Sequence, residues 1–237
     1  MRLALLAALL AALLLGACAR PPAPLGDHVA TLHPGGAGLH PAVVLVPGCD
    51  GVRAHIDDAA RRFLEAGFLT LVYDYPRRLR VDAACASLDV AALGQEIAGL
   101  AQRAAGASRL HAVGWAQGGA AAMAAVANNP ALFKSAAAFY PDCARLQSWS
   151  IPVPFLLLLG AEDTRMPGER CSQLAERAQG AARVLAIRYG GAGHGFDAAA
   201  PPASGWRPFA PASAWRFDAQ VRDGAWLDLK IFFDAAE

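Results

Sequence analysis

The chain has 237 residues, of which 55% are hydrophobic and 17% are charged, and its formal net charge is +1. A chain of this length and apolar content can bury one large core, so we expect a single α/β domain without internal repeats. The balanced charge, with no run of basic residues, argues against nucleic acid as a partner.

The N-terminus has the features of an export signal. Arg2 gives a positive start, and residues 3–15 are an unbroken run of leucine and alanine that is too short to span a membrane. The run ends in Leu-Gly-Ala-Cys, which resembles the bacterial lipobox, where cleavage leaves a lipidated cysteine. We therefore expect a signal peptide over residues 1–17 and an envelope protein anchored by acyl chains on Cys18. The alternative is ordinary secretion without a lipid.

Beyond the proposed anchor, strand and helix signals alternate along the chain. Residues 18–40 are expected to be a Pro-rich tether, and residues 41–237 the folded domain. Continuous apolar runs of the kind found in buried parallel strands predict strands at residues 42–46, 69–73, 109–113, 135–140, 153–159 and 183–189. With helices predicted between and after the strands, the pattern indicates a mainly parallel sheet covered on both faces. The short connections leave no room for a large lid domain.

The segment at residues 114–118 is the most informative part of the sequence. It reads Gly-Trp-Ala-Gln-Gly and lies between a predicted strand and an Ala-rich helical stretch. This is the layout of the nucleophile elbow, G-x-S-x-G, in which a tight strand-to-helix turn presents the nucleophile. Ala116 occupies the third position, and alanine has no oxygen or sulfur with which to attack.

Two further residues suit acyl transfer. Asp163 follows the predicted strand at residues 153–159 and is the candidate acid that orients an imidazole, with Glu162 as the alternative one residue earlier. His194 lies in a Gly-rich loop after the strand at residues 183–189 and is the candidate general base. The chain order of nucleophile position, acid and histidine is that of α/β-hydrolases.

The loop at residues 47–51 completes the predicted site. In an α/β-hydrolase such a loop and the residue after the nucleophile each give one backbone N–H to the oxyanion hole, so Cys49 and Gln117 are the expected donors. Cys49 itself is a remote candidate for a substitute nucleophile. A loop at residues 198–213 carries Trp206, and we expect it either to form one wall of a pocket or to be a passive surface loop.

Four cysteines remain after the proposed anchor. An even number in an exported protein predicts disulfides, and three pairings are possible. The alternative is four free thiols, some of them buried as small apolar side chains. The four cysteines are Cys49, Cys85, Cys143 and Cys171.

From about residue 40 to residue 233 the chain resembles the dienelactone hydrolase family of α/β-hydrolases. Within the family it is most similar to a branch with a Gly-Cys-x-Gly oxyanion loop and two further cysteines. The resemblance implies hydrolysis of a small carboxylic ester or lactone without a cofactor or a metal. It also implies the disulfides Cys49–Cys85 and Cys143–Cys171. The segments that carry the likeness are residues 49–51, 139–143, 160–163, 170–171 and 192–197.

The chain departs from the family in two places. The family has cysteine or serine where Ala116 stands. Dienelactone hydrolases proper also carry a glutamate in the oxyanion segment, where this chain has Pro47 and Gly48, so dienelactone itself is not the expected substrate.

Without a nucleophile at Ala116 there can be no acyl-enzyme. We therefore favour a monomeric hydrolase scaffold with lost or altered activity, which binds a small ester, lactone or carboxylate. The alternatives are slow hydrolysis in which His194 and Asp163 activate water, an active hydrolase seen as a nucleophile-knockout variant, or an envelope adaptor lipoprotein that reuses the fold.

Overall fold

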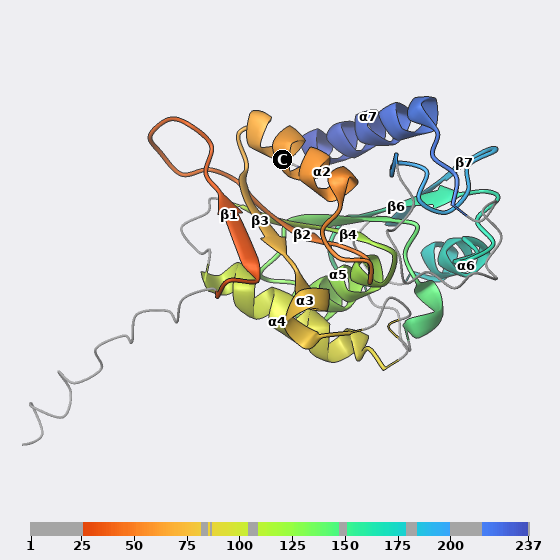
Figure 1. The fold of residues 1–237 in the computed structure, drawn as a ribbon, viewed down its shortest axis with the longest axis horizontal. Helices are drawn as coiled ribbons and strands as arrows, with labels where there is room; N and C mark the ends of the chain where they lie inside the picture. The colour runs from red at the N-terminus through yellow and green to blue at the C-terminus, as the bar shows by residue number, and fades with distance from the viewer. Residues whose placement is uncertain are drawn as a thin grey trace, which may run out of the picture.

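The computed structural model describes residues 26–81, 85, 87–103, 109–146, 151–178, 184–199 and 215–236. Within these ranges seven strands form one sheet (Figure 1), in the order β1-β3-β2-β4-β5-β6-β7. The strands are β1 (Val29–Leu32), β2 (Ala42–Val46), β3 (Leu69–Tyr73), β4 (Leu110–Trp115), β5 (Ser135–Phe139), β6 (Phe155–Gly160) and β7 (Val184–Tyr189). The helices are α2 (Ala54–Glu65), α3 (Tyr75–Leu79), α4 (Val90–Arg103), α5 (Ala116–Asn128), α6 (Glu169–Arg177) and α7 (Ala219–Ala235), with a 3-10 turn η1 (Cys143–Arg145).

The sheet is parallel from β3 through β7, and only β1 runs antiparallel to its neighbour β3. All five residues of β2 are buried because both faces of the sheet are covered. Val44 and Val46 point into one core, and Val43 and Leu45 point into the other. The predicted α/β class with a mainly parallel, two-sided sheet is confirmed.

Helices α2 and α7 cover one face of the sheet, and α4 and α5 cover the opposite face (Figure 1). Gly94 allows α4 and α5 to pack closely, since a Cβ built there would lie only 2.9 Å from the Cβ of Ala124. The small residues of α5 thus bring it against both its neighbour and the sheet, and its first turn lies directly on the ends of β2 and β4.

The sheet begins earlier in the chain than predicted. β1 pairs with the outer edge of β3, and the backbone N–H of Asp74 donates to the carbonyl of His28 at 2.8 Å. The segment expected as a tether, residues 18–40, therefore contains a strand, and the predicted domain start at residue 41 is too late. The four residues of β1, two exposed and two partly buried at a sheet edge, give no continuous apolar run to detect.

Several predicted features lie outside the described residues. These are the signal peptide over residues 1–17, the anchor Cys18, and Trp206 with most of its loop. Among the residues that are described, no helix is both long enough and apolar enough to cross a bilayer.

Candidate functional site

The strand-to-helix turn predicted at residues 114–118 is present. β4 ends at Trp115 and α5 begins at Ala116 without an intervening loop. Ala116 has φ 51°, in the left-handed region that costs a non-glycine residue energy and that persists where the surrounding structure enforces it. Gly118 is required by close contact, because a Cβ there would lie 2.1 Å from the carbonyl oxygen of Pro47. The turn is therefore tight, strained and pressed against the end of β2.

Asp163 and His194 form a buried pair at the ends of β6 and β7. Nδ1 of His194 lies 2.8 Å from Oδ2 of Asp163, and both side chains are almost fully buried. The other oxygen of Asp163 accepts hydrogen bonds from the backbone N–H groups of Arg165 and Met166 at 2.8 and 2.9 Å. These bonds fix the carboxylate, which in turn orients the imidazole.

Glu162 does not take part in this pair. It is more than half exposed, and it forms an ion pair with Arg216 at 2.7 Å. Of the two acids that the sequence left open, Asp163 is the one that the structure brings to His194.

Two aromatic rings enclose the imidazole of His194. The ring of Tyr140 lies 4.6 Å from it and that of Trp215 lies 5.2 Å away, centroid to centroid. Gly195, with φ 69°, allows the close approach of Trp215, because a Cβ there would lie 2.5 Å from the indole. Among the described residues, none forms a hydrogen bond with Nε2 of His194.

Asp197 joins the histidine loop to the turn at Ala116. Its carboxylate accepts from Nε1 of Trp115 at 2.7 Å and from the hydroxyl of Tyr140 at 2.6 Å. Burial, with the nearby charge of Asp197, raises the pKa of Tyr140 well above its usual value, so the phenol stays a donor. The sequence analysis missed Asp197. The available signal was a Trp and a Tyr at adjacent strand ends, since both need hydrogen-bond partners when buried.

The loop after β2 lies against the first turn of α5. It closes as a turn in which the N–H of Gly51 donates to the carbonyl of Gly48 at 3.0 Å. The backbone N–H groups of Cys49 and Gln117 donate to no described residue. Gln117 lies in the first turn of α5, and unpaired N–H groups at a helix start are suited to hold a negatively charged oxygen. The structure thus brings both predicted donors to the end of the sheet where Ala116 lies.

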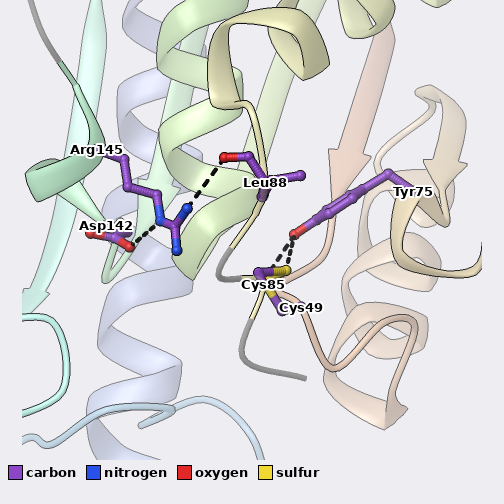
Figure 2. The surroundings of a disulfide bond; sticks show 6 residues. All are labelled: Cys49, Tyr75, Cys85, Leu88, Asp142 and Arg145. Atoms are coloured by element: carbon purple, nitrogen blue, oxygen red, sulfur yellow. Dashed lines mark hydrogen bonds and ion pairs between the residues drawn. A yellow bond between two sulfur atoms is a disulfide. The ribbon is translucent and has the colours of Figure 1, made fainter. Parts of the chain in front are cut away.

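Both disulfides implied by the resemblance are present. Cys49–Cys85 and Cys143–Cys171 have Cα–Cα distances of 5.8 and 5.4 Å. Figure 2 shows the hydroxyl of Tyr75 directed at the sulfurs of the first pair, 3.5 Å from Cys49 and 3.9 Å from Cys85. Because Cys49 is bonded to Cys85, it has no thiol to act as a nucleophile.

A hollow of about 410 Å³ lies beside the loop that follows Asp163. Pro141, Arg165 and Arg170 are among the residues that line it. Asp142 and Glu169 also line it, so its charged side chains are two arginines and two carboxylates. Among the described residues, no group of three or more His, Cys, Asp or Glu side chains is placed to hold a metal ion.

The parallel sheet, the turn between β4 and α5, and an acid and a histidine at successive strand ends define an α/β-hydrolase. The sequence model of the Dienelactone hydrolase family matches residues 29–236. The chain belongs to the dienelactone hydrolase family. No curated protein matches it in sequence.

Solved structures show the same fold at low sequence identity. A Klebsiella pneumoniae protein assigned as a dienelactone hydrolase is 22% identical, with a TM-score of 0.68. The match covers 87% of this chain and 92% of that one. Esterase 2 of Thermogutta terrifontis with propionate bound is 19% identical, with a TM-score of 0.54 over 71% and 79% of the two chains. A dienelactone hydrolase-like promiscuous phosphotriesterase from metagenomic libraries is 22% identical, with a TM-score of 0.60 over 84% and 88%.

Proposed function

We propose that the protein is a dienelactone-hydrolase-type scaffold for small carboxylic esters or lactones in which Ala116 occupies the nucleophile position. One observation carries the proposal. A strained left-handed residue at the start of α5 is the geometry that presents a nucleophile in this fold, and the same strand ends hold a buried His194–Asp163 pair. The N–H groups of Cys49 and Gln117 are the proposed oxyanion donors.

Alanine at this position prevents covalent catalysis. Loss of the nucleophile in a triad hydrolase costs about 10⁶ in kcat, and about 10³ to 10⁴ over the uncatalysed rate survives from binding and the oxyanion hole. Under this proposal the protein binds an ester, lactone or carboxylate, and it hydrolyses esters slowly or not at all. Propionate bound to the Thermogutta terrifontis esterase supports a small acyl group as the ligand.

The test is to restore the nucleophile. Ala116→Cys and Ala116→Ser should raise kcat/KM for short p-nitrophenyl esters by orders of magnitude, with cysteine the better choice because it is intrinsically more nucleophilic. Ala91, an exposed alanine on α4, provides the matched controls Ala91→Cys and Ala91→Ser, which should change nothing. If both restored variants stay as inert as the parent, the scaffold serves binding or an adaptor role instead.

We also propose that the protein is a monomer held at the bacterial cell envelope by lipid on Cys18, after removal of residues 1–17. The proposal rests on the apolar run and the lipobox-like Leu-Gly-Ala-Cys. Cys18→Ser should move the protein from the membrane fraction to the soluble fraction. A variant that stays as firmly attached as the parent would contradict the lipid anchor.

A further inference from the structure

A carboxylate of the loop after β2 borders the space beside Ala116. A Cβ built on Gly48 would lie 2.9 Å from Oδ1 of Asp50 and 3.4 Å from the Cβ of Ala116. The turn from Gly48 to Gly51 folds the Asp50 side chain back over Gly48, which has no side chain to exclude it. The carboxylate and the alanine methyl therefore face the same small space.

Asp50 has no hydrogen-bond donor among the described residues. Its Oδ2 is fully buried without a partner, although the residue as a whole is partly exposed. A buried carboxylate oxygen without a donor is costly. Oδ1, the oxygen that lies toward Gly48 and Ala116, is the one placed to accept a hydrogen bond, or a proton, from a molecule that enters the site.

The charge of Asp50 acts on Tyr75, Tyr140 and Arg165. Burial, with the charge of Asp50, raises the pKa of the Tyr75 hydroxyl. Burial and Asp197, with a smaller contribution from Asp50, raise the pKa of Tyr140, so both phenols stay protonated. Burial lowers the pKa of Arg165, while the charges of Asp163 and Asp50 oppose that lowering. Arg165 therefore offsets part of the negative charge that two carboxylates bring to the site.

We propose that Asp50 is the general base of a direct hydrolysis in which water replaces the missing side-chain nucleophile. The inference rests on the proposed function, because it uses the same oxyanion donors and the same histidine. It differs in assigning removal of the proton from water to a carboxylate of the oxyanion loop, which leaves His194 to protonate the leaving group.

The reaction balances in three steps. Asp50 takes a proton from water while the water oxygen bonds to the ester carbonyl carbon, and the carbonyl electrons move to the oxygen held by Cys49 and Gln117. Collapse of the tetrahedral species breaks the bond to the leaving oxygen, which takes a proton from His194 as an imidazolium paired with Asp163. The proton that Asp50 took from water then passes through solvent to His194, which restores the carboxylate and the imidazolium. One ester and one water become one acid and one alcohol.

The experiment compares Asp50→Asn in two backgrounds, the parent and Ala116→Ser. In the parent, the change should lower kcat/KM for p-nitrophenyl acetate about 100-fold. In Ala116→Ser the same change should lower kcat/KM by about tenfold or less, because His194 then activates the serine. Asp50→Glu should retain more of the parent rate than Asp50→Asn does. Asp57→Asn, an exposed change on α2, is the matched control and should have no effect.

Two further readouts separate a base from a structural role. Parent hydrolysis should be slower in D₂O, and intact-mass spectrometry should find no acyl adduct during turnover. Equal losses in both backgrounds would overturn the inference, as would a parent that turns over no ester or is unaffected by Asp50→Asn. A gain with Ala116→Ser in those same assays would leave the proposed function standing, whereas an inert Ala116→Ser would remove both.

Discussion

The indole of Trp115 donates a 2.7 Å hydrogen bond to Asp197, 82 residues further along the chain. The second oxygen of Asp197 accepts from the Tyr140 hydroxyl. Trp115 immediately precedes Ala116, and Asp197 lies three residues after His194. One buried carboxylate thus ties the strand-to-helix turn to the histidine loop, without any direct bond between the two functional positions.

Asp197→Ala should destabilise the protein strongly. The change leaves the Trp115 N–H and the Tyr140 hydroxyl buried without an acceptor, and together these losses should cost about 3 kcal/mol. Asp197→Asn keeps one acceptor and should cost less. Urea unfolding measures both, with the exposed Asp234 of α7 as the control position. If Asp197→Ala changes stability no more than Asp234→Ala does, the carboxylate is not a structural link.

The strands that could be predicted are those whose residues alone reveal burial. β2 and β3 have the predicted bounds, residues 42–46 and 69–73, because an apolar run covered on both faces leaves an unmistakable pattern. The edge strand β1 has no such run. Its position depends on pairing with β3, which is a contact between residues about 40 positions apart.

Some residues of the site could likewise be predicted from the sequence, and others could not. Ala116, Asp163 and His194 could be placed because the carboxyl ends of parallel strands lie at one edge of the sheet. The sequence could not choose between Glu162 and Asp163, since a shift of one residue exchanges a buried side chain for an exposed one. Asp50 was missed as a possible base because only the fold of its turn brings it beside Ala116.

His111 should make the protein less stable in acid. Its ring is fully buried and lies 2.9 Å from the hydroxyl of Ser135. Burial, with the positive charges of Arg109 and Lys134, lowers the pKa of His111 from 6.5 to about 4. The unfolded chain therefore binds a proton at higher pH than the folded one, and stability falls as pH drops from about 6.5 to about 4.

The loss from His111 over that interval should approach about 3 kcal/mol. Urea unfolding at pH 7 and at pH 4.5 should show a larger acid loss for the parent than for His111→Gln, whose side chain does not titrate. Equal losses in the two proteins would mean that other groups control the acid sensitivity.

The two disulfides should contribute similarly to stability but differently to the site. They join residues 36 and 28 positions apart, and loop-closure entropy gives each about 3 to 4 kcal/mol. The double variants Cys49→Ser/Cys85→Ser and Cys143→Ser/Cys171→Ser should therefore unfold at similarly reduced urea concentrations.

Only the first of these pairs includes a proposed oxyanion donor. Introduced into Ala116→Ser, the Cys49→Ser/Cys85→Ser change should lower kcat more than the other double variant does, because it frees the loop that carries the Cys49 N–H. Assays below the unfolding transition of both proteins make the comparison fair. Equal effects on kcat would place the role of Cys49–Cys85 in stability alone.

Asp163 and its neighbour Glu162 allow a sharp test of the histidine pair. In the Ala116→Cys background, Asp163→Asn should reduce kcat by about 10² to 10⁴, because the amide cannot stabilise the imidazolium and can hold the ring of His194 in the wrong tautomer. Glu162→Gln removes one negative charge at the adjacent position but touches only Arg216 at the surface, so it should leave kcat within about twofold. Steady-state kinetics on one ester measures both variants. A loss with Glu162→Gln as large as that with Asp163→Asn would show that local charge, and not the 2.8 Å contact with His194, supports the reaction.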